Sequence, residues 1–533
     1  MPEMLDVLRA RAQDDSVALR IEDESWTYRQ WTQTCVDRAA LFNEMRIDGP
    51  PHVGILLDNV ADFTMWLGAV GLLGATAVGI NPTRRGEELA RDIRYTDCQL
   101  IVTDTAQMHL LDGLDLGAAS GRILVIDTPE YSAALASVAG ENFDDVAVPV
   151  APESTLFLLF TSGTSGAPKA VIRTYGRVLS IAEQMLMQIK IGPDDTTYIS
   201  MPLFHSNALF TAWVPSVLVG ATIAMRRKFS ASAFLPDVRR FGATYFNYVG
   251  KPLAYVLATP ELPDDADNTL RIGFGNEANE ADIARFAQRF ACPLIDGYGQ
   301  TETGASVGRV PGMPNGALGM ATPETKVLNS DTGLECPRAH FDDNGQLINA
   351  SDAIGEIVNT AGTLFEGYYN NDEANAQRLR EGAYWTGDLA YRDAAGYFYF
   401  AGRTADWLRV DGENFSAAPV ERIVNRFPGV VLSAVYAVPD EVVGDAVVAA
   451  ILMEPGVSFD AARFGEFLAA QPDLGTKWAP RYVRVVAAFP MTETNKVLKR
   501  HLVLEGLATP DSLWHRPAAA LAYETFTRPP GVG

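Results

Sequence analysis

The order of local patterns along the chain constrains the fold more than any other feature. Over the first 400 residues, short β-rich runs alternate with stretches whose apolar residues recur at helical spacing. The β-rich runs include "HVGILL" (52–57), "LIVTD" (100–104), "RILVID" (122–127), "TYFNYV" (244–249) and "LRIGFG" (270–275). The clearest helical stretch covers 174–189. This alternation is typical of an α/β fold with mostly parallel sheets.

The pattern changes near Gly402. The remaining chain predicts a helix over 417–427, two strands over 430–438 and 445–453, a helix that opens with "SFDAARF", and a strand over 483–489. We expect the tail from Pro510 to be irregular. A compact α+β unit therefore follows the α/β part. We place the boundary at 403–406, which gives domains 1–403 and 404–533.

The composition argues against some classes of function. The chain has 43 Lys and Arg against 66 Asp and Glu, a formal net charge of −23. Binding to nucleic acid or to an anionic membrane surface requires clustered positive charge, so we expect neither. The four cysteines, Cys35, Cys98, Cys292 and Cys336, are far apart and form no CxxC pair. They predict a reducing, cytoplasmic location without disulfides or a zinc site.

One segment is long and uncharged enough to span a bilayer, because no charged residue lies between Asp62 and Arg84. Its four glycines, its proline and the charged sequence after it favour a buried helix to about Gly74, followed by the short strand "TAVGI". We therefore predict no transmembrane helix. The N-terminus carries charges where a signal peptide would need an apolar block.

A loop rich in hydroxyl groups follows one of the apolar runs. The segment "TSGTSGAPK" (161–169) comes directly after Thr155–Phe160 and before the helical stretch, so it predicts a strand-to-helix connection. Glycines let backbone N–H groups converge, hydroxyls add donors, and Lys169 adds a mobile positive charge. The segment therefore predicts a cradle for a polyphosphate. It is not a Walker A loop, because Gly166 is not followed by Lys and then Ser or Thr.

Five motifs together resemble one known family. They are "TSGTSGAPKA" (161–170), "DGYGQTETG" (296–304), "YWTGDLA" (384–390), "GRTADWLRVDGENFSAAPVE" (402–421) and "MTETNKVLKR" (491–500). In this order they resemble the adenylate-forming superfamily, which includes acyl-CoA synthetases, luciferases and peptide-synthetase adenylation domains. The fourth motif looks most like the very-long-chain acyl-CoA synthetase and fatty-acid transport protein branch. The resemblance implies an N-terminal domain of stacked, mostly parallel sheets with helices, and a small mobile C-terminal lid.

The resemblance also implies which residues bind the phosphates of ATP and Mg²⁺. The expected phosphate-binding residues are Thr161, Ser162, Gly163, Thr164, Ser165, Gly166 and Lys169. Glu302 would hold Mg²⁺, with a hydroxyl oxygen of Thr161 or Thr301 as a further ligand. Oxygen ligands suit this hard cation, whose charge offsets that of the phosphates.

The nucleoside is expected to lie on the second and third motifs. Tyr298 would stack on adenine, and Asp296 or the backbone at 275–277 would meet its amino edge. Further nucleotide contacts are expected from Gly275, Asn276, Glu277, Gly299, Gln300 and Thr301. Asp388 would accept hydrogen bonds from both ribose hydroxyls, and Arg403 would contact the ribose or a nearby phosphate.

The C-terminal motifs imply a lysine that enters the site when the lid turns. Lys496 is the expected catalytic lysine, although Asn495 stands where glycine is common and Lys499 is an alternative. The pivot of the lid is expected at Ala405 or, one residue later, at Asp406. Gly412, Glu413 and Asn414 lie where the loop would meet the thiol arm of coenzyme A.

The acid is expected to be hydrophobic. His205 falls where the family places a gate over the acyl site, with a candidate apolar pocket formed by Phe210, Trp213, Val214, Tyr248, Val249 and Gly250. No acidic residue is present in the His205 segment to pair with a substrate amine. We therefore expect a medium to very-long-chain fatty acid or a steroid-type acid.

Three hypotheses for the function follow from these residues. The leading one is an ATP-dependent, Mg²⁺-requiring acyl-CoA synthetase that forms acyl-AMP, then the CoA thioester. The second is a stand-alone adenylating enzyme that passes the acyl group to a carrier protein. The third is a catalytically silent nucleotide- or lipid-binding protein. The sequence leaves open which acid is used and whether the protein is a monomer or a homodimer.

Overall fold

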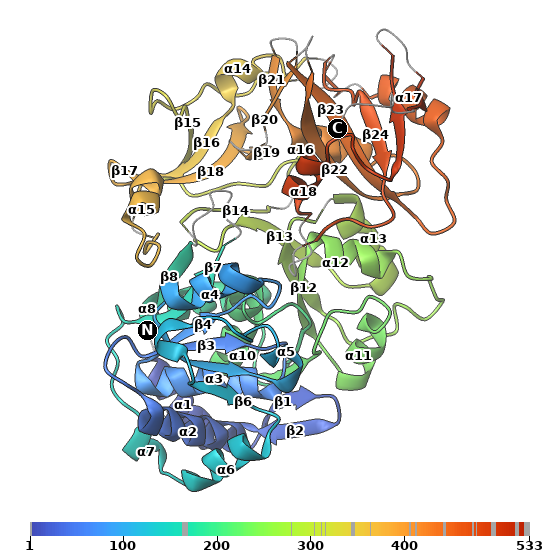
Figure 1. Cartoon of the computed structure of the whole chain (residues 1–533). Coiled ribbons are helices and arrows are strands. Elements are labelled where there is room, and N and C mark those ends of the chain that lie inside the picture. The colour runs from blue at the N-terminus through green and yellow to red at the C-terminus, as the bar shows by residue number, and fades with distance from the viewer. Residues whose placement is uncertain are drawn as a thin grey trace.

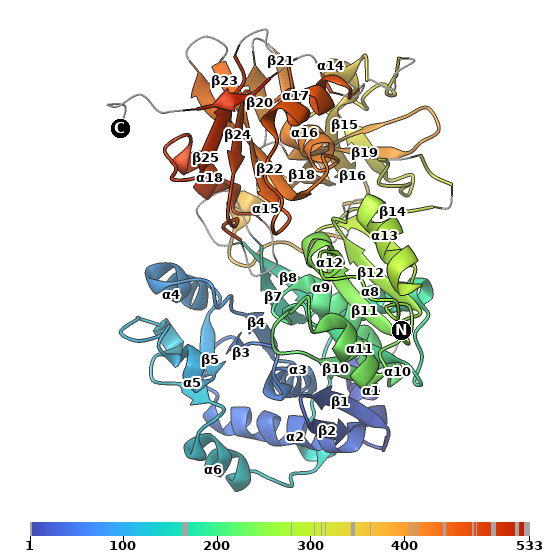
Figure 2. The same cartoon turned by 90° about the vertical axis from the view of Figure 1, so that its right-hand side faces the viewer.

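The computed structural model shows two lobes in both views (Figures 1 and 2). It describes residues 3–161, 169–278, 280–302, 304–310, 312–314, 316–342, 347–362, 364–403, 407–410, 413–440, 444–471, 474–475, 477–491, 497–517 and 522–526. The blue-to-green part of the chain forms one lobe, and the yellow-to-red part forms the other.

A six-stranded sheet runs through the first lobe in the order β6-β5-β3-β4-β7-β8. Its strands are β3 (His52–Leu56), β4 (Thr76–Gly79), β5 (Cys98–Thr103), β6 (Ile123–Val125), β7 (Thr155–Phe160) and β8 (Ala170–Thr174). Only the β7–β8 pair is antiparallel. Both faces of β3 and β5 are buried, as expected for strands inside a parallel sheet.

An eight-stranded sheet has the order β14-β13-β12-β11-β9-β10-β1-β2. Its strands are β1 (Val17–Ile21), β2 (Glu24–Thr27), β9 (Thr196–Ile199), β10 (Thr222–Met225), β11 (Tyr245–Val249), β12 (Ile272–Asn276), β13 (Leu294–Gly299) and β14 (Ser306–Gly308). Only the edge pairs β1–β2 and β13–β14 are antiparallel.

Helices fill the space between the two sheets and cover their outer faces. The helices of this lobe are α1 (Met4–Arg11), α2 (Tyr28–Met45), α3 (Ala61–Leu73), α4 (Gly86–Tyr95), α5 (Thr105–Met108), α6 (Pro129–Ser137), α7 (Phe143–Val146), α8 (Tyr175–Ile189), α9 (Ser206–Ala208), α10 (Val214–Val219), α11 (Phe234–Phe241), α12 (Gly250–Leu257) and α13 (Glu280–Phe290), with the 3₁₀ turn η1 (Gly117–Ala119) and the π-turn η2 (Leu209–Trp213). The central core joins α2, α3, α8, α10 and η2 to both sheets. Helix α4 packs on the outer face of the six-stranded sheet, and α11, α12 and α13 on that of the eight-stranded sheet.

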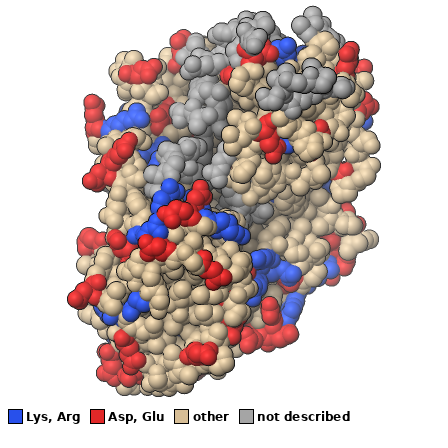
Figure 3. All heavy atoms as spheres, viewed as in Figure 1, with Lys and Arg blue, Asp and Glu red and all other residues tan. Residues whose placement is uncertain are grey.

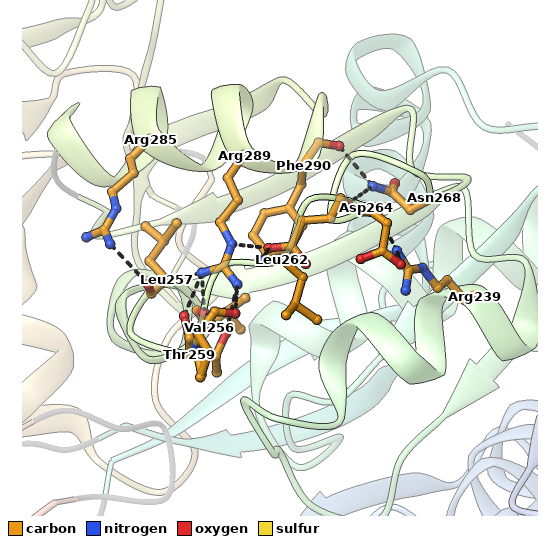
Figure 4. Close-up of polar contacts among 12 residues, drawn as sticks. Arg239, Val256, Leu257, Thr259, Leu262, Asp264, Asn268, Arg285, Arg289 and Phe290 are labelled. Atoms are coloured by element: carbon orange, nitrogen blue, oxygen red, sulfur yellow. Dashed lines mark hydrogen bonds and ion pairs between the residues drawn. The ribbon is translucent and has the colours of Figure 1, made fainter. Parts of the chain in front are cut away.

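A buried ion pair fixes the chain after α12 (Figure 4). Arg289 of α13 donates to Asp265 at 2.6 Å, and the two side chains are only 4% and 3% exposed. The same guanidinium donates to the carbonyls of Val256, Leu257, Thr259 and Pro260 at 3.4, 3.2, 3.0 and 2.8 Å. The last carbonyls of a helix lack partners within it, so Arg289 caps the end of α12.

The second lobe begins with an antiparallel sheet. It consists of β15 (Thr325–Leu328), β16 (Gly355–Asn359), β17 (Leu379–Arg380), β18 (Ala383–Arg392) and β19 (Phe398–Arg403), with α14 (Ala350–Ala353) and α15 (Asp372–Arg378) nearby. The expectation of mostly parallel sheets up to residue 400 is therefore wrong for 325–403, where hairpins replace helical crossovers.

A seven-stranded sheet forms the rest of this lobe. Its strands are β20 (Trp407–Val410), β21 (Glu413–Ser416), β22 (Val430–Asp440), β23 (Gly444–Met453), β24 (Tyr482–Val485), β25 (Ser512–His515) and β26 (Glu524–Thr525). Helices α16 (Ala417–Val424) and α17 (Ala461–Ala469) pack on one face, and α18 (Lys499–Glu505) on the other. The predicted cap of α17 is confirmed, because the Asp460 side chain accepts from the Arg463 amide. The tail was expected to be irregular, but β25 and β26 extend the sheet there.

The uncharged segment after Asp62 divides into a helix and a strand, as predicted. Helix α3 ends at Leu73 and is followed by Gly74, whose φ of 63° is the left-handed conformation that suits glycine. Strand β4 follows at once. Among the described residues, no helix combines the length and the apolar character needed to cross a bilayer.

The surface view shows how the net charge is distributed (Figure 3). On this face Asp and Glu are spread over both lobes, whereas Lys and Arg gather mainly near the middle. Most of the Lys and Arg visible on this face therefore lie near the junction of the lobes.

Candidate active site

One cavity of about 3650 Å³ lies between the two lobes. Both lobes contribute to its wall, because residues of α8, α12 and α13 line it together with residues of α16, α18 and β22. It contains Lys169, Glu302 and Asp388, three predicted site residues from distant parts of the sequence. Lys169 and Glu302, which the resemblance assigns to the phosphates and to Mg²⁺, therefore line the same cavity.

The chain continues after Lys169 as strand β8 and not directly as a helix, so the predicted strand-to-helix connection is wrong. The Thr161 amide donates to the Lys169 carbonyl at 3.1 Å, and β8 then runs back along β7 before α8 begins. The run "AVIRT" is short and β-branched, and it adds an antiparallel edge strand to an otherwise parallel sheet. Both Thr161 and Lys169 line the cavity.

Lys169 and Glu302 both lie next to Tyr368. The Lys169 ammonium lies 5.7 Å from the centre of the Tyr368 ring, and the Tyr368 hydroxyl donates to Glu302 at 2.8 Å. Burial and the nearby Arg378 guanidinium lower the pKa of Lys169, while Glu302 acts to raise it. Burial and the Glu302 charge raise the pKa of Tyr368, so its hydroxyl stays protonated and donates. Lys169 and Arg378 therefore bring two positive charges, and Glu302 one buried carboxylate, to the same cavity.

Asp388 is held by the second motif. It is 3% exposed, and its Oδ2 accepts from the Tyr298 hydroxyl at 2.7 Å and from the Gln300 side-chain Nε2 at 2.5 Å. The Tyr384 hydroxyl in turn donates to Oε1 of the Gln300 side chain at 2.8 Å. Strand pairing sets Asp388 directly opposite the backbone of Arg403. The two expected ribose-binding residues therefore lie side by side on β18 and β19.

The predicted adenine-binding residues form another part of the wall. Gly275, Asn276, Glu277, Asp296, Tyr298, Gly299 and Thr301 all line the cavity. Asp296 accepts from the Tyr248 hydroxyl and the Ala278 amide, both at 3.1 Å. Burial raises the pKa of Asp296 to about 7 despite these bonds. Gly250 must be a glycine, because a Cβ there would lie 1.9 Å from the Glu277 carbonyl oxygen.

The expected acyl pocket is only partly right. His205 lines the cavity and lies against the Phe204 ring, with 4.2 Å between the ring centres. Phe210, Val249 and Gly250 also line it. Trp213, Val214 and Tyr248 belong to the core instead. The π-turn η2 carries Trp213 toward Trp31, and Tyr248 points to the opposite face of β11 from Val249.

Some predicted residues cannot be placed. Ser162, Gly163, Thr164, Ser165, Gly166, Ala405, Asp406, Gly412 and Lys496 lie outside the described residues. Glu413 and Asn414 lie on β21. Met491 and Val497 pair in a β-bridge and line the cavity. The alternative lysine, Lys499, also lines the cavity and forms an ion pair with Glu421 at 2.9 Å.

Sequence reasoning missed several residues of the site. Tyr368, Arg378 and Ser206 line the cavity but belong to none of the quoted motifs. The Ser206 hydroxyl lies 3.1 Å from the Thr301 hydroxyl. The Gly-Tyr pair in "FEGYYN" (365–370) was a weak signal for Tyr368, whereas nothing local indicates Arg378 or Ser206.

Comparison with known proteins assigns the family. The family model described as "AMP-binding enzyme" matches residues 8–369, and the model "AMP-binding enzyme C-terminal domain" matches residues 419–496. The chain belongs to the AMP-binding enzyme family. Its resemblance to the adenylate-forming superfamily is thereby confirmed.

Two relatives and one solved structure show how far the likeness extends. A steroid-22-oyl-CoA synthetase of Rhodococcus jostii is 51% identical over 92% of this chain and 89% of its own length. A medium/long-chain-fatty-acid–CoA ligase, FadD17 of Mycobacterium marinum, is 48% identical over 89% of this chain and 90% of its own length. ATP-bound MatB from Rhodopseudomonas palustris shares the fold with a TM-score of 0.80 at 21% identity, over 94% of this chain and 98% of that one.

These findings confirm the enzyme class that the motifs predict. The chain is an AMP-forming acid–thiol ligase, an acyl-CoA synthetase that uses ATP and coenzyme A. The predicted fold class is also confirmed, with a large α/β part followed by a smaller C-terminal domain. The narrower resemblance to the very-long-chain branch and the roles of single residues stay predictions.

The donor set fits the Mg²⁺ that this chemistry requires. Glu302 is 8% exposed and offers carboxylate oxygens, the preceding Thr301 offers a hydroxyl, and both residues line the cavity. Within the described part of the chain, no group of three His, Cys, Asp or Glu residues could form a complete metal site. A single carboxylate suits Mg²⁺, which keeps water and substrate phosphate oxygens as its other ligands.

Proposed function

We propose that the enzyme activates a hydrophobic carboxylic acid, either a medium to very-long-chain fatty acid or a steroid-type acid. One observation carries this proposal: the cavity that contains Lys169 and Glu302 also has an extended apolar wall. That wall is built from Ile181, Met185, Phe210, Val249, Ala254 and Phe274. A hydrophobic acid would gain about 25 cal/mol for each Å² of apolar surface that it buries there. The names of the relatives support the same substrate class.

The polar wall would promote the first half of the reaction. A carboxylate oxygen of the acid attacks the α-phosphorus of ATP. The bond between the α-phosphorus and the oxygen that bridges it to the β-phosphorus breaks, and pyrophosphate leaves. Two anions must approach, so positive charge and alignment supply most of the rate. Lys169 and Arg378 would offset the phosphate charge, Asp388 would orient the ribose, and Glu302 would hold the magnesium ion, which adds charge neutralisation.

The second half would use the C-terminal domain as a lid. We place the domains at 1–403 and 404–533, with the pivot at Ala405 or Asp406. Strands on the two sides of this point belong to different sheets, which supports the division. Lys496 would complete the adenylation site, and after rotation Gly412, Glu413 and Asn414 would meet coenzyme A. Its thiolate then attacks the acyl carbonyl and AMP leaves.

The test separates the two halves of the reaction. Exchange of labelled pyrophosphate into ATP, measured with fatty acids from C6 to C26 and with sterol acids, reports adenylation. Thioester formation with coenzyme A reports the second half. We expect both with a hydrophobic acid, and exchange with none of these acids would overturn the proposal.

The same test decides between the alternatives. A stand-alone adenylating enzyme would exchange pyrophosphate without consuming coenzyme A, and would transfer the acyl group only to a phosphopantetheinyl carrier. A silent binding protein would do neither. The common cavity of Lys169, Glu302 and Asp388 favours catalysis.

The location is also a proposal. All four cysteines are buried and none is in a disulfide, which supports a reducing, cytoplasmic compartment. We expect either a monomer or a homodimer.

A further inference from the structure

A buried arginine lies next to the catalytic wall, and the proposed mechanism does not use it. Arg173 lies on β8, the strand that begins directly after Lys169, and its side chain is 0% exposed. Its guanidinium donates to the Thr301 carbonyl at 2.5 Å, to Glu366 at 3.2 Å and to the Ile172 carbonyl at 2.7 Å. Burial lowers the pKa of Arg173, and the charges of Glu366 and Glu302 act to raise it. A charge buried this completely needs such partners.

The partner carboxylate is itself fixed to β8. Glu366 accepts from the Thr174 hydroxyl at 2.6 Å and from the Thr174 amide at 3.3 Å. Two residues later, the Tyr368 hydroxyl donates to Glu302. The segment around 366–368 therefore connects the strand after the phosphate loop with the carboxylate expected to hold Mg²⁺.

Thr301 and Glu302 are consequently held at three points. Arg173 holds the Thr301 carbonyl, Ser206 lies in hydrogen-bond range of the Thr301 hydroxyl, and Tyr368 holds the Glu302 carboxylate. Ser206 and Tyr368 line the cavity, whereas the Arg173 side chain does not. A rigid donor fork of this kind fixes a backbone position without touching the substrate.

We propose that Arg173, paired with Glu366, is a positioning residue for adenylation. It fixes the Thr301–Glu302 peptide so that the Thr301 hydroxyl and the Glu302 carboxylate face the triphosphate and the acid. The proposal rests on the adenylation activity proposed above. It assigns Arg173 to the first half of the reaction alone, because the second half requires neither the triphosphate nor Glu302.

The experiment measures both halves and nucleotide binding in Arg173→Met, with Arg289→Met as the matched control. Both variants remove a fully buried guanidinium that pairs with one carboxylate and caps backbone carbonyls. Misplacing a catalytic group by about 1 Å can cost on the order of 100-fold. We expect Arg173→Met to lower pyrophosphate exchange by about that factor, and to change thioester formation from supplied acyl-AMP no more than the control does.

Calorimetric titration with ATP and Mg²⁺ gives a readout that does not depend on turnover. We expect Arg173→Met to weaken binding by between about twofold and 30-fold relative to wild type, the range typical of coupled positions. The control should bind like wild type. If the wild type exchanges no pyrophosphate with any acid, the proposed function fails, but this titration still decides the inference.

Two milder variants keep the test decisive if Arg173→Met does not fold. Arg173→Lys keeps the charge but cannot present two donors in a fork, so it should show the same selective loss of exchange. Glu366→Gln keeps the shape of the partner and removes its charge. The effects of Arg173→Lys and Glu366→Gln should combine non-additively, because the two side chains touch. Equal losses in both halves of the reaction, or losses no larger than in Arg289→Met, would overturn the proposal.

Discussion

Two buried arginines of this enzyme have the same chemistry and different surroundings. Arg289 pairs with Asp265 and donates to four carbonyls at the end of α12 and just after it, and nothing in that cluster lines the cavity (Figure 4). Arg173 pairs with Glu366 and donates to Thr301, which does line the cavity. The first cluster is closed off from the cavity, and the second is open to it through Thr301.

The difference shows that a buried ion pair does not by itself indicate function. Burying two charges costs free energy that their attraction only partly returns, so such pairs occur for structural reasons as well. What separates the clusters is where the hydrogen-bond chain ends. Around Arg289 it ends on backbone carbonyls and the Thr259 hydroxyl, all away from the cavity, whereas around Arg173 it reaches the carbonyl of Thr301, a residue that lines the cavity. We therefore expect variants of the closed cluster to lose stability and variants of the open cluster to lose rate.

The largest effect on stability is expected at the closed cluster. Arg289→Met leaves Asp265 buried without its partner, which should cost about 3–5 kcal/mol of unfolding free energy. Urea denaturation monitored by circular dichroism measures it. The kcat of the folded fraction should stay at the wild-type value. A folded variant with a hundredfold lower kcat would contradict the claim that the Arg289 cluster affects stability and not rate.

The next effect concerns the lid lysine. Lys496→Ala should lower pyrophosphate exchange by about 10²–10³-fold, by analogy with the loss of one oxyanion donor. Thioester formation from supplied acyl-AMP should persist, because the lysine would then have left the site. Lys499→Ala is the matched control, since Lys499 is already engaged by Glu421. A larger loss of exchange in the control would reassign the catalytic lysine to Lys499.

A smaller effect should appear as a pH dependence. Burial raises the pKa of Asp296 to about 7, so its carboxyl is neutral in more acidic solution and accepts poorly from the adenine amino group. The KM for ATP should therefore fall by up to about tenfold per pH unit as the pH rises toward 7, and Asp296→Asn should flatten this profile.

The raised pKa of Asp296 should also make the free energy of unfolding depend on pH. The native chain keeps the Asp296 proton to higher pH than the unfolded chain, where the carboxyl has its ordinary pKa of 3.8. The free energy of unfolding therefore falls as the pH rises from about 4 to about 7. Asp296→Asn should remove this contribution, and an unchanged slope in denaturation curves would contradict the assignment.

A further effect is expected at Tyr368. Tyr368→Phe removes one hydrogen bond to Glu302 without changing the ring, so we expect a loss of about 1.5–3 kcal/mol at most, since the acceptor is charged. The concentration of Mg²⁺ for half-maximal exchange should rise, while the KM for the acid should not. A change in the acid KM alone would place Tyr368 in the acyl pocket.

Local sequence patterns were enough for much of the fold. Strand β7 begins and ends where the apolar run does, and α8 starts after Thr174, whose hydroxyl caps it as expected for an N-cap threonine. Strand β8 was missed because five β-branched-rich residues between a loop and a helix carry no period that distinguishes them from a connection. The tail strands β25 and β26 were missed because runs of four and two residues are too short to show an alternating pattern.

The site was predictable where it consists of motifs, and not where it depends on tertiary pairing. Lys169, Glu302 and Asp388 each belong to a recognisable string, so their common cavity could be anticipated. Arg173 and Glu366 are 193 residues apart, and neither has a neighbouring signal that points to the other. The π-turn η2 likewise turns Trp213 into the core, and no pattern in the sequence indicates this change in helical period.

The central claim is that the wall around Lys169 and Glu302 performs adenylation, and Glu302→Gln tests it most directly. The substitution keeps the size and shape of the side chain but removes the charge expected to hold Mg²⁺. Pyrophosphate exchange and thioester formation from supplied acyl-AMP should be measured on the same preparation with a hydrophobic acid. We predict that exchange falls by at least about 100-fold while thioester formation stays near the wild-type rate. Wild-type exchange in this variant, or an equal loss in both halves, would contradict the account.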